Sequence, residues 1–148
     1  MAVEVMSFGA ISKLYEGMQP KDQIVLANIF GLHNSVFPSW LHNFSYVRNI
    51  CAHHSRLWSK ELAIAMVLPK KPEWNGVNPR RIASVIFALE YMLSKLPAGK
   101  EISTAWHEEI CTHLQKPVKV DNFYESMGLT EKFRQHPLLL LAKAKWTA

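Results

Sequence analysis

The chain has few of the features that mark secreted or membrane-spanning proteins. Its 148 residues include two cysteines, Cys51 and Cys111. Neither cysteine belongs to a Cys-x-x-Cys pair, so we expect no disulfide framework and a reducing cytoplasm. The longest apolar runs, Leu62–Leu68 and Leu138–Ala142, are far shorter than the roughly 20 residues of a membrane-spanning helix. An early Glu4 and the lack of a basic leading region argue against a signal peptide.

The composition is that of an ordinary globular domain with a moderate basic excess. Hydrophobic residues make up 49% and charged residues 20% of the chain. This length suits one domain with its own core, so we expect residues 1–148 to form a single domain. Lysine and arginine number 17 against 12 acidic residues, for a net charge of +5. That excess favours an anionic partner only slightly, because many basic proteins bind no nucleic acid.

The spacing of apolar residues is helical almost throughout, which predicts an all-α bundle of about five main helices. An irregular proline-rich loop is expected at residues 63–78, where Pro69, Pro72 and Gly76 interrupt the pattern. Short helices are expected near Phe123–Met127, with Gly128 as the stop, and near Thr130–Gln135. The first main helix is expected to carry Val3 to Tyr15 and to be ended by Gly17 and Pro20. The other main helices are expected to run from Asp22 to Phe30, from Asn34 or Ser35 to about Leu62, from Pro79, with Asn78 as its cap, to Leu96, and from Ser103 to Gln115.

One stretch on the expected third helix, Arg48–Trp58, carries side chains suited to phosphodiester chemistry. Arginine binds phosphate through a planar fork of donors, and histidine moves protons near neutral pH. These residue types together indicate cleavage chemistry that needs no metal. On a helix that turns by about 100° per residue, one polar arc would hold Arg48, Asn49, His53, Arg56 and Lys60.

The same periodicity distinguishes two adjacent histidines. His53 would lie one turn from Asn49, whose amide could orient its imidazole, so we expect His53 to be the chemical residue. His54 would fall on the apolar arc and is expected to be a partly buried structural histidine. The alternative is that the polar arc is only a solvated helix face, as most such faces are.

Two other basic groups have both a binding and a structural interpretation. Lys70 and Lys71 with Trp74 could contact RNA, since bases stack on aromatic rings, or could form a solvated turn anchored by the tryptophan. Arg80 and Arg81 at an expected helix start face the positive end of the helix dipole. This placement hints at an anionic partner.

A metal site is not expected. His107 and Cys111 are four residues apart and could share a metal ion, but no second pair has ligand spacing. Neighbouring histidines on a helix do not face one another. We therefore expect no metal ion and no other cofactor.

The motif segment also resembles a known family. Residues Tyr46–Trp58 are similar to the signature segment of the Abi-like (abortive infection) bacterial proteins of the HEPN superfamily, and Glu4–Gly9 with Leu14 and Tyr15 resembles the same family. The superfamily is marked by Arg-x-x-x-x-His, sometimes with further intervening residues. Arg48 and His53 match this form, and Arg48 with His54 matches the form with one more residue.

The resemblance implies a HEPN-type helical bundle that forms a homodimer with two motifs across its interface. It implies a metal-independent endoribonuclease of the bacterial cytoplasm, used as a toxin or against phage. Arg48, Asn49 and His53 would be catalytic, His54 and Arg56 secondary, and RNA would be left with 2′,3′-cyclic phosphate and 5′-hydroxyl ends. Expected partners are single-stranded or looped RNA, a second copy of the chain, and an antitoxin or regulatory RNA.

Three alternative interpretations are also consistent with the sequence. Abi-like proteins are commonly longer, with an N-terminal half that has no counterpart here, so the chain could be a fragment of a longer protein. It could also be a non-catalytic RNA-binding or antitoxin-type module. A third alternative is a dimerisation domain that buries the polar arc at a two-fold interface.

Overall fold

The computed structural model describes residues 6–96, 100–114, 121–130 and 132–140. Within these ranges the chain is helical and forms no strand, which confirms the all-α class. Two short 3-10 helices, η2 (Pro72–Trp74) and η3 (Phe133–Gln135), add to the α-helices. The α-helices are α1 (Phe8–Glu16), α2 (Pro20–Ile29), α3 (Phe37–Ala52), α4 (Ile82–Leu93), α5 (Lys100–Leu114) and α6 (Phe123–Met127).

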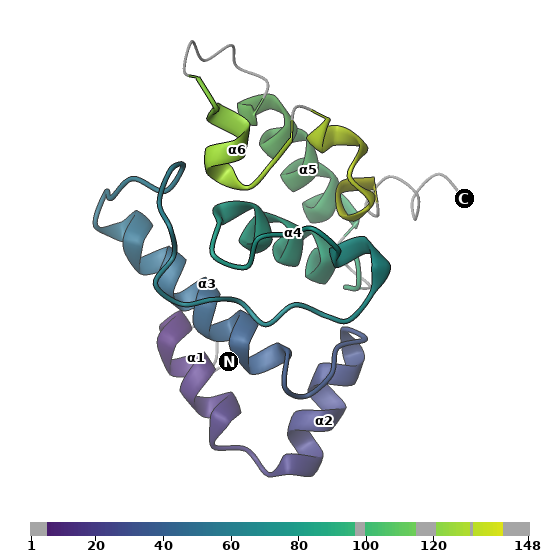
Figure 1. The fold of residues 1–148 in the computed structure, drawn as a ribbon. Helices are drawn as coiled ribbons and strands as arrows, with labels where there is room; N and C mark the ends of the chain where they lie inside the picture. Colours follow the sequence, from purple (N-terminus) through teal and green to yellow (C-terminus); the bar gives the residue numbers. More distant parts are fainter. Residues whose placement is uncertain (1–5, 97–99, 115–120, 131, 141–148) are drawn as a thin grey trace.

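The helices are stacked roughly in the order of the chain. α1 packs on α3, α3 on α4, and α4 on α5. In Figure 1, α1 and α2 lie below α3, while α4, α5 and α6 lie above it. The irregular segment 53–81, which joins α3 to α4, runs along the boundary between these two parts. α3 is therefore the element against which both parts of the bundle are assembled.

Side-chain hydrogen bonds cap both ends of α1. The hydroxyl of Ser7 accepts a hydrogen bond of 3.2 Å from the Ala10 N–H, which satisfies a free donor of the first turn of α1. The side-chain amide of Gln23 on α2 donates to the carbonyl oxygens of Tyr15 at 3.0 Å and Glu16 at 3.2 Å. These carbonyls belong to the last turn of α1 and have no partner within that helix. Gln23 therefore fixes the angle between α1 and α2.

Trp40 on α3 is the centre of the core and is fully buried. Its ring centroid lies 5.2 Å from that of Trp74 and 5.7 Å from that of Tyr91 on α4. Its indole N–H donates to the Val67 carbonyl at 2.9 Å. Since a buried tryptophan needs both apolar neighbours and an acceptor, this one residue joins α3, α4 and the irregular segment.

Several expected boundaries differ from those of the structure. α3 ends at Ala52, ten residues before the expected end near Leu62, so the irregular segment is longer than the expected loop at 63–78. Arg81, not Asn78, is the cap of α4. The Asn78 side chain accepts a hydrogen bond of 2.9 Å from the Arg80 N–H and closes a turn. Such local bonds to asparagine form turns as readily as helix caps.

Candidate active site at the end of α3

The motif lies at the C-terminal end of α3 and beyond it. The Ser55 N–H donates to the Ile50 carbonyl at 3.1 Å, and the His54 N–H donates to the Cys51 carbonyl at 2.9 Å. His54 has a φ of 53° and so adopts the left-handed conformation. These two bonds around a left-handed residue form a Schellman motif, the usual way to satisfy the last carbonyls of a helix.

This helix end corrects the expected place of His54. A left-handed residue turns the chain away from the helix, so the apolar arc does not continue to residue 54. His54 is exposed, not partly buried as predicted. Histidine is one of the non-glycine residues that occupy the left-handed region relatively often. The argument from periodicity that set His54 aside therefore no longer holds.

His53 lies one helical turn after Asn49, as the helical spacing predicts. His53 is the cap residue of α3, and its N–H donates to the Asn49 carbonyl at 3.1 Å. This bond places the two residues one helical turn apart. The Arg48 guanidinium donates to the side-chain oxygen of Asn49 at 3.2 Å. Arg48, Asn49 and His53 are thus all exposed at the C-terminal end of α3.

The surroundings of this group suit an anion. Arg48, Arg56 and Lys60 are exposed cations. Between Asp22 and Glu61 the sequence contains no aspartate or glutamate, so α3 and both of its flanks carry no carboxylate. Arg48 therefore has no carboxylate partner within α3 or its flanks, and the guanidinium donors that do not bond Asn49 suit phosphate oxygens. The last turn of α3 therefore combines phosphate donors with imidazole groups open to solvent.

Arg56 and Lys60 do not share a helix face with Arg48, because the helix has ended before them. They lie in the following turn-rich stretch, where the Lys60 N–H donates to the Leu57 carbonyl at 3.1 Å. The Trp58 ring in this stretch lies 5.7 Å from that of Phe123 on α6. Aromatic contacts at this distance stabilise by about 0.5–1.5 kcal/mol beyond burial. The C-terminal part of the chain therefore holds the segment that follows the histidines.

Two arginines at the start of α4 hold the same segment. Arg81 donates from Nη1 to the carbonyl oxygens of Ser59 at 3.0 Å and Ser126 at 3.3 Å. Arg80 donates from Nη1 to the carbonyls of residues 62 and 63 at 3.1 and 3.0 Å. Both guanidinium groups thus stabilise the fold by bonding backbone carbonyls. The sequence pattern did not reveal this role. Their acceptors are backbone atoms, which carry no signal in the amino-acid sequence.

Lys70, Lys71 and Trp74 lie at the other end of α3. Trp74 is 3% exposed and packs against Trp40 and Tyr91, so it offers no ring face on which a base could stack. The structure agrees with the alternative interpretation, in which Trp74 anchors a turn. Lys71 donates to the Tyr91 hydroxyl at 2.9 Å. These residues therefore do not extend the surface around Arg48.

A second group of polar side chains lies between α4 and α5. Glu90 is fully buried, and its Oε1 lies 3.2 Å from Nδ1 of His107. Nε2 of His107 lies 3.6 Å from the sulfur of Cys111. Burial raises the pKa of the Glu90 carboxyl from 4.5 to about 7. Among the residues that the structure describes, no group of three or more His, Cys, Asp or Glu side chains is placed to hold a metal ion.

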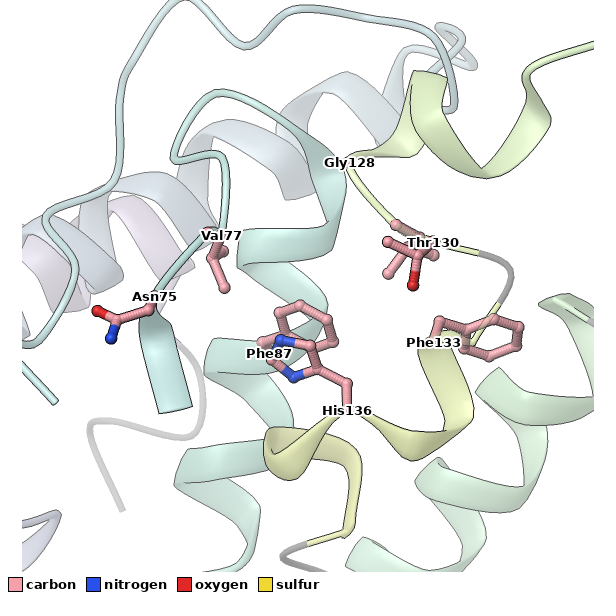
Figure 2. A pocket seen from close by; sticks show the side chains of 9 residues that line it. Asn75, Val77, Phe87, Gly128, Thr130, Phe133 and His136 are labelled. Carbon is pink, nitrogen blue, oxygen red and sulfur yellow. The ribbon is translucent and has the colours of Figure 1, made fainter. Parts of the chain in front are cut away.

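A small cavity lies between α4, residues 75–77 and the segment that follows α6, and it is away from the motif. It measures about 220 Å³ and is lined by Asn75, Phe87 and His136 among others. Figure 2 shows the rings of Phe87 and His136 one over the other, and their centroids are 4.2 Å apart. Burial lowers the pKa of His136. None of the motif residues lines this cavity.

The first part of the chain matches one protein family. Residues 1–59 match the family model described as Abi-like protein, which covers α1, α2, α3 and the motif as far as Trp58. No curated protein and no solved structure gives a match. The similarity therefore includes the candidate site but not Arg80 and Arg81. No helix within the described ranges has the length and hydropathy that crossing a membrane requires.

Proposed function

We propose that the chain is a metal-independent endoribonuclease of the abortive-infection type. The observation that carries the proposal is the exposed group of Arg48, Asn49 and His53 at the last turn of α3, beside an exposed His54. The Abi-like match of residues 1–59 supports it, because the matched part contains all four residues. An assignment to the HEPN superfamily is part of this proposal, since Arg48 and His53 have its motif spacing.

The chemistry follows from the residue types. The 2′-hydroxyl oxygen of RNA attacks the adjacent phosphorus and forms a 2′,3′-cyclic phosphate, while the bond from phosphorus to the 5′-oxygen breaks. A neutral His53 takes the proton of the 2′-hydroxyl as general base. Arg48 binds the scissile phosphate and stabilises the negative charge that builds on its oxygens. The departing 5′-oxygen takes a proton and becomes a 5′-hydroxyl.

The proton for the departing oxygen must come from a second acid. His54 is one source, because it is exposed and adjacent to His53. In a homodimer, the other source is a histidine of the second copy, with two motifs facing one another. We propose this dimer as the active form, with single-stranded or looped RNA as substrate. A bacterial cytoplasmic location and an antitoxin or regulatory RNA belong to the same proposal.

A non-catalytic RNA-binding or dimerisation module in phage defence is the alternative. Exposed arginines alone would serve a binder, and lysine would bind phosphate there as well as histidine does. The two adjacent exposed histidines favour the enzyme, because imidazole adds proton transfer and little binding.

Alanine variants separate these functions. For the enzyme, His53→Ala should lower the cleavage rate by about 100-fold or more and leave RNA affinity close to that of the parent. Arg48→Ala should lower both. If the chain only binds RNA, Arg48→Ala should lose RNA affinity and neither the parent nor the variants should cleave RNA. If the chain is a dimerisation module, the alanine variants should lose self-association, measured by equilibrium sedimentation. Full cleavage by His53→Ala would refute the assigned role of His53.

A further inference from the structure

A larger cavity lies at the opposite end of α3 from the motif. It has a volume of about 410 Å³, and its walls come from residues 31–36 before α3 and residues 67–71 of the irregular segment. Pockets for small molecules usually measure about 300–1,000 Å³. The 16 residues of α3 span about 24 Å, so this cavity is separate from the candidate active site.

We propose that this cavity binds a nucleoside monophosphate unit, with the base against its aliphatic wall and the phosphate beside Lys70 and Lys71. The unit could be a free nucleotide or the phosphorylated end of an RNA strand, which present the same chemistry. The site does not depend on the proposed cleavage activity.

The aliphatic wall is the first support for this ligand. Leu32 and Val36 are buried at 3% and 5% exposure, while Val67 is 45% exposed. All three line the cavity. An apolar side chain left in water at a cavity mouth gains stability when a flat ligand ring covers it. The backbone of Val67 is fixed on both sides of its Cα. Its N–H donates to the Ser39 hydroxyl and its carbonyl accepts from the Trp40 indole, each at 2.9 Å.

The charge of the cavity is the second support. Lys70 and Lys71 line it, and none of its ten lining residues is acidic. The Lys71 ammonium group lies 2.9 Å from the Tyr91 hydroxyl and 3.4 Å from the Gly31 carbonyl. An ammonium group has three donors, so these contacts hold Lys71 in place and leave one donor for a ligand oxygen.

His33 adds a directed donor. Its Nδ1 accepts a hydrogen bond of 3.2 Å from the Ser35 N–H, and the Ser35 hydroxyl lies 2.8 Å from the same atom. In the neutral ring Nε2 then carries the proton and can donate to a ligand. A bare anion would leave the aliphatic wall in water, and an apolar ligand would use neither the Lys70 ammonium group nor the third donor of Lys71. A nucleotide satisfies both parts of the cavity.

Isothermal titration calorimetry with adenosine 5′-monophosphate tests the proposal, using the chain with His53→Ala so that no cleavage is required. Val67→Glu adds a negative charge and bulk at the mouth of the cavity and should weaken binding by about tenfold or more. Val25→Glu is the matched control, since Val25 is 61% exposed on α2 and does not line the cavity. Equal losses of affinity in the two variants would overturn the proposal. It would also be overturned if the parent bound neither this nucleotide nor a 5′-phosphorylated oligouridylate.

A second pair of variants, in which one lysine is replaced in each, tests the proposal even if the Val67→Glu variant does not fold. Lys70→Gln should weaken nucleotide binding by about tenfold, whereas Lys132→Gln, which removes an exposed lysine outside the cavity, should not. Equal affinities of these two variants would overturn the placement of the phosphate.

A second titration distinguishes the two sources of the ligand. It uses a short oligouridylate with either a 5′-phosphate or a 5′-hydroxyl. If only the phosphorylated strand binds, and Val67→Glu abolishes that binding, the ligand is an RNA end. If the mononucleotide binds and neither strand does, the ligand is a free nucleotide. Either result supports the cavity as a nucleotide site, whatever the cleavage assays show.

Discussion

Arg81 donates a hydrogen bond of 3.0 Å from its guanidinium to the carbonyl oxygen of Ser59, five residues after His54. The same nitrogen donates to the Ser126 carbonyl at 3.3 Å. One side chain thus connects the segment that follows the histidines to the end of α6. The segment that directly follows the motif is therefore held by residues outside the part that matches the Abi-like family.

Replacing Arg81 with glutamine should destabilise the protein by about 1–3 kcal/mol, because two backbone carbonyls lose a charged donor. Hydrogen exchange should accelerate at residues 55–60, which Arg81 holds. Urea unfolding and hydrogen exchange followed by mass spectrometry measure the two effects. Arg134→Gln is the control, since Arg134 is exposed and lies at η3, away from this segment. Unchanged exchange at residues 55–60 would show that Arg81 does not hold them.

His54→Gly should stabilise the fold by up to about 1 kcal/mol, because glycine adopts the left-handed conformation without steric cost. His53→Gly should destabilise it, since His53 has a φ of −92°, where glycine gains nothing and costs backbone entropy. The difference in the free energy of unfolding between these two variants is the measurement. The same sign for both would contradict the Schellman end of α3.

Gly128→Ala should destabilise the fold more than Gly76→Ala does. Both glycines have a φ of 81°, so each alanine carries a strain of about 1–2 kcal/mol. A Cβ at Gly128 would also lie 2.6 Å from Cβ of Arg81, whereas none of the neighbouring atoms comes within 4 Å at Gly76. Thermal unfolding of the two variants isolates this clash. Equal losses would mean that Gly128 and Arg81 are not in close contact.

Glu90 should make stability depend on pH. Burial raises its pKa from 4.5 to about 7. Between pH 4.5 and 7 the folded state therefore holds a proton that the unfolded state has released. The contribution of Glu90 is therefore most favourable below about pH 4.5 and is lost as the pH rises to 7. The loss is on the order of 2–3 kcal/mol.

The Glu90→Gln variant isolates this effect, because glutamine keeps the shape of the side chain and does not titrate. The difference in the free energy of unfolding, parent minus variant, should fall between pH 5 and 7 and stay level above pH 8. A difference that does not change over this range would mean that the buried carboxyl titrates normally.

The sequence predicted the helical class well because its apolar residues repeat at helical spacing and its strongest stops are glycines. Gly17 and Gly128 end α1 and α6 as expected. The end of α3 could not be predicted, because a histidine, His54, occupies the position that glycine usually takes. Residues 53–62 contain neither glycine nor proline, so the pattern gave no reason to stop the helix.

The candidate site was predicted in part for the same reason. Arg48, Asn49 and His53 lie within or directly after α3, where the helical spacing still holds. Arg56 and Lys60 were placed on the same face by extending a helix that has already ended. The roles of Arg80 and Arg81 depend on contacts with distant carbonyls, which no local pattern encodes.

The most direct test of the central claim is cleavage of labelled single-stranded RNA in excess chelator, comparing the parent with its His53→Ala variant. We expect cleavage by the parent, with 2′,3′-cyclic phosphate and 5′-hydroxyl ends, and a loss of about 100-fold or more in the variant. Cleavage that stops when the metal is removed, or that leaves 3′-hydroxyl and 5′-phosphate ends, would contradict it. Equal rates for the parent and the variant would contradict the role of His53.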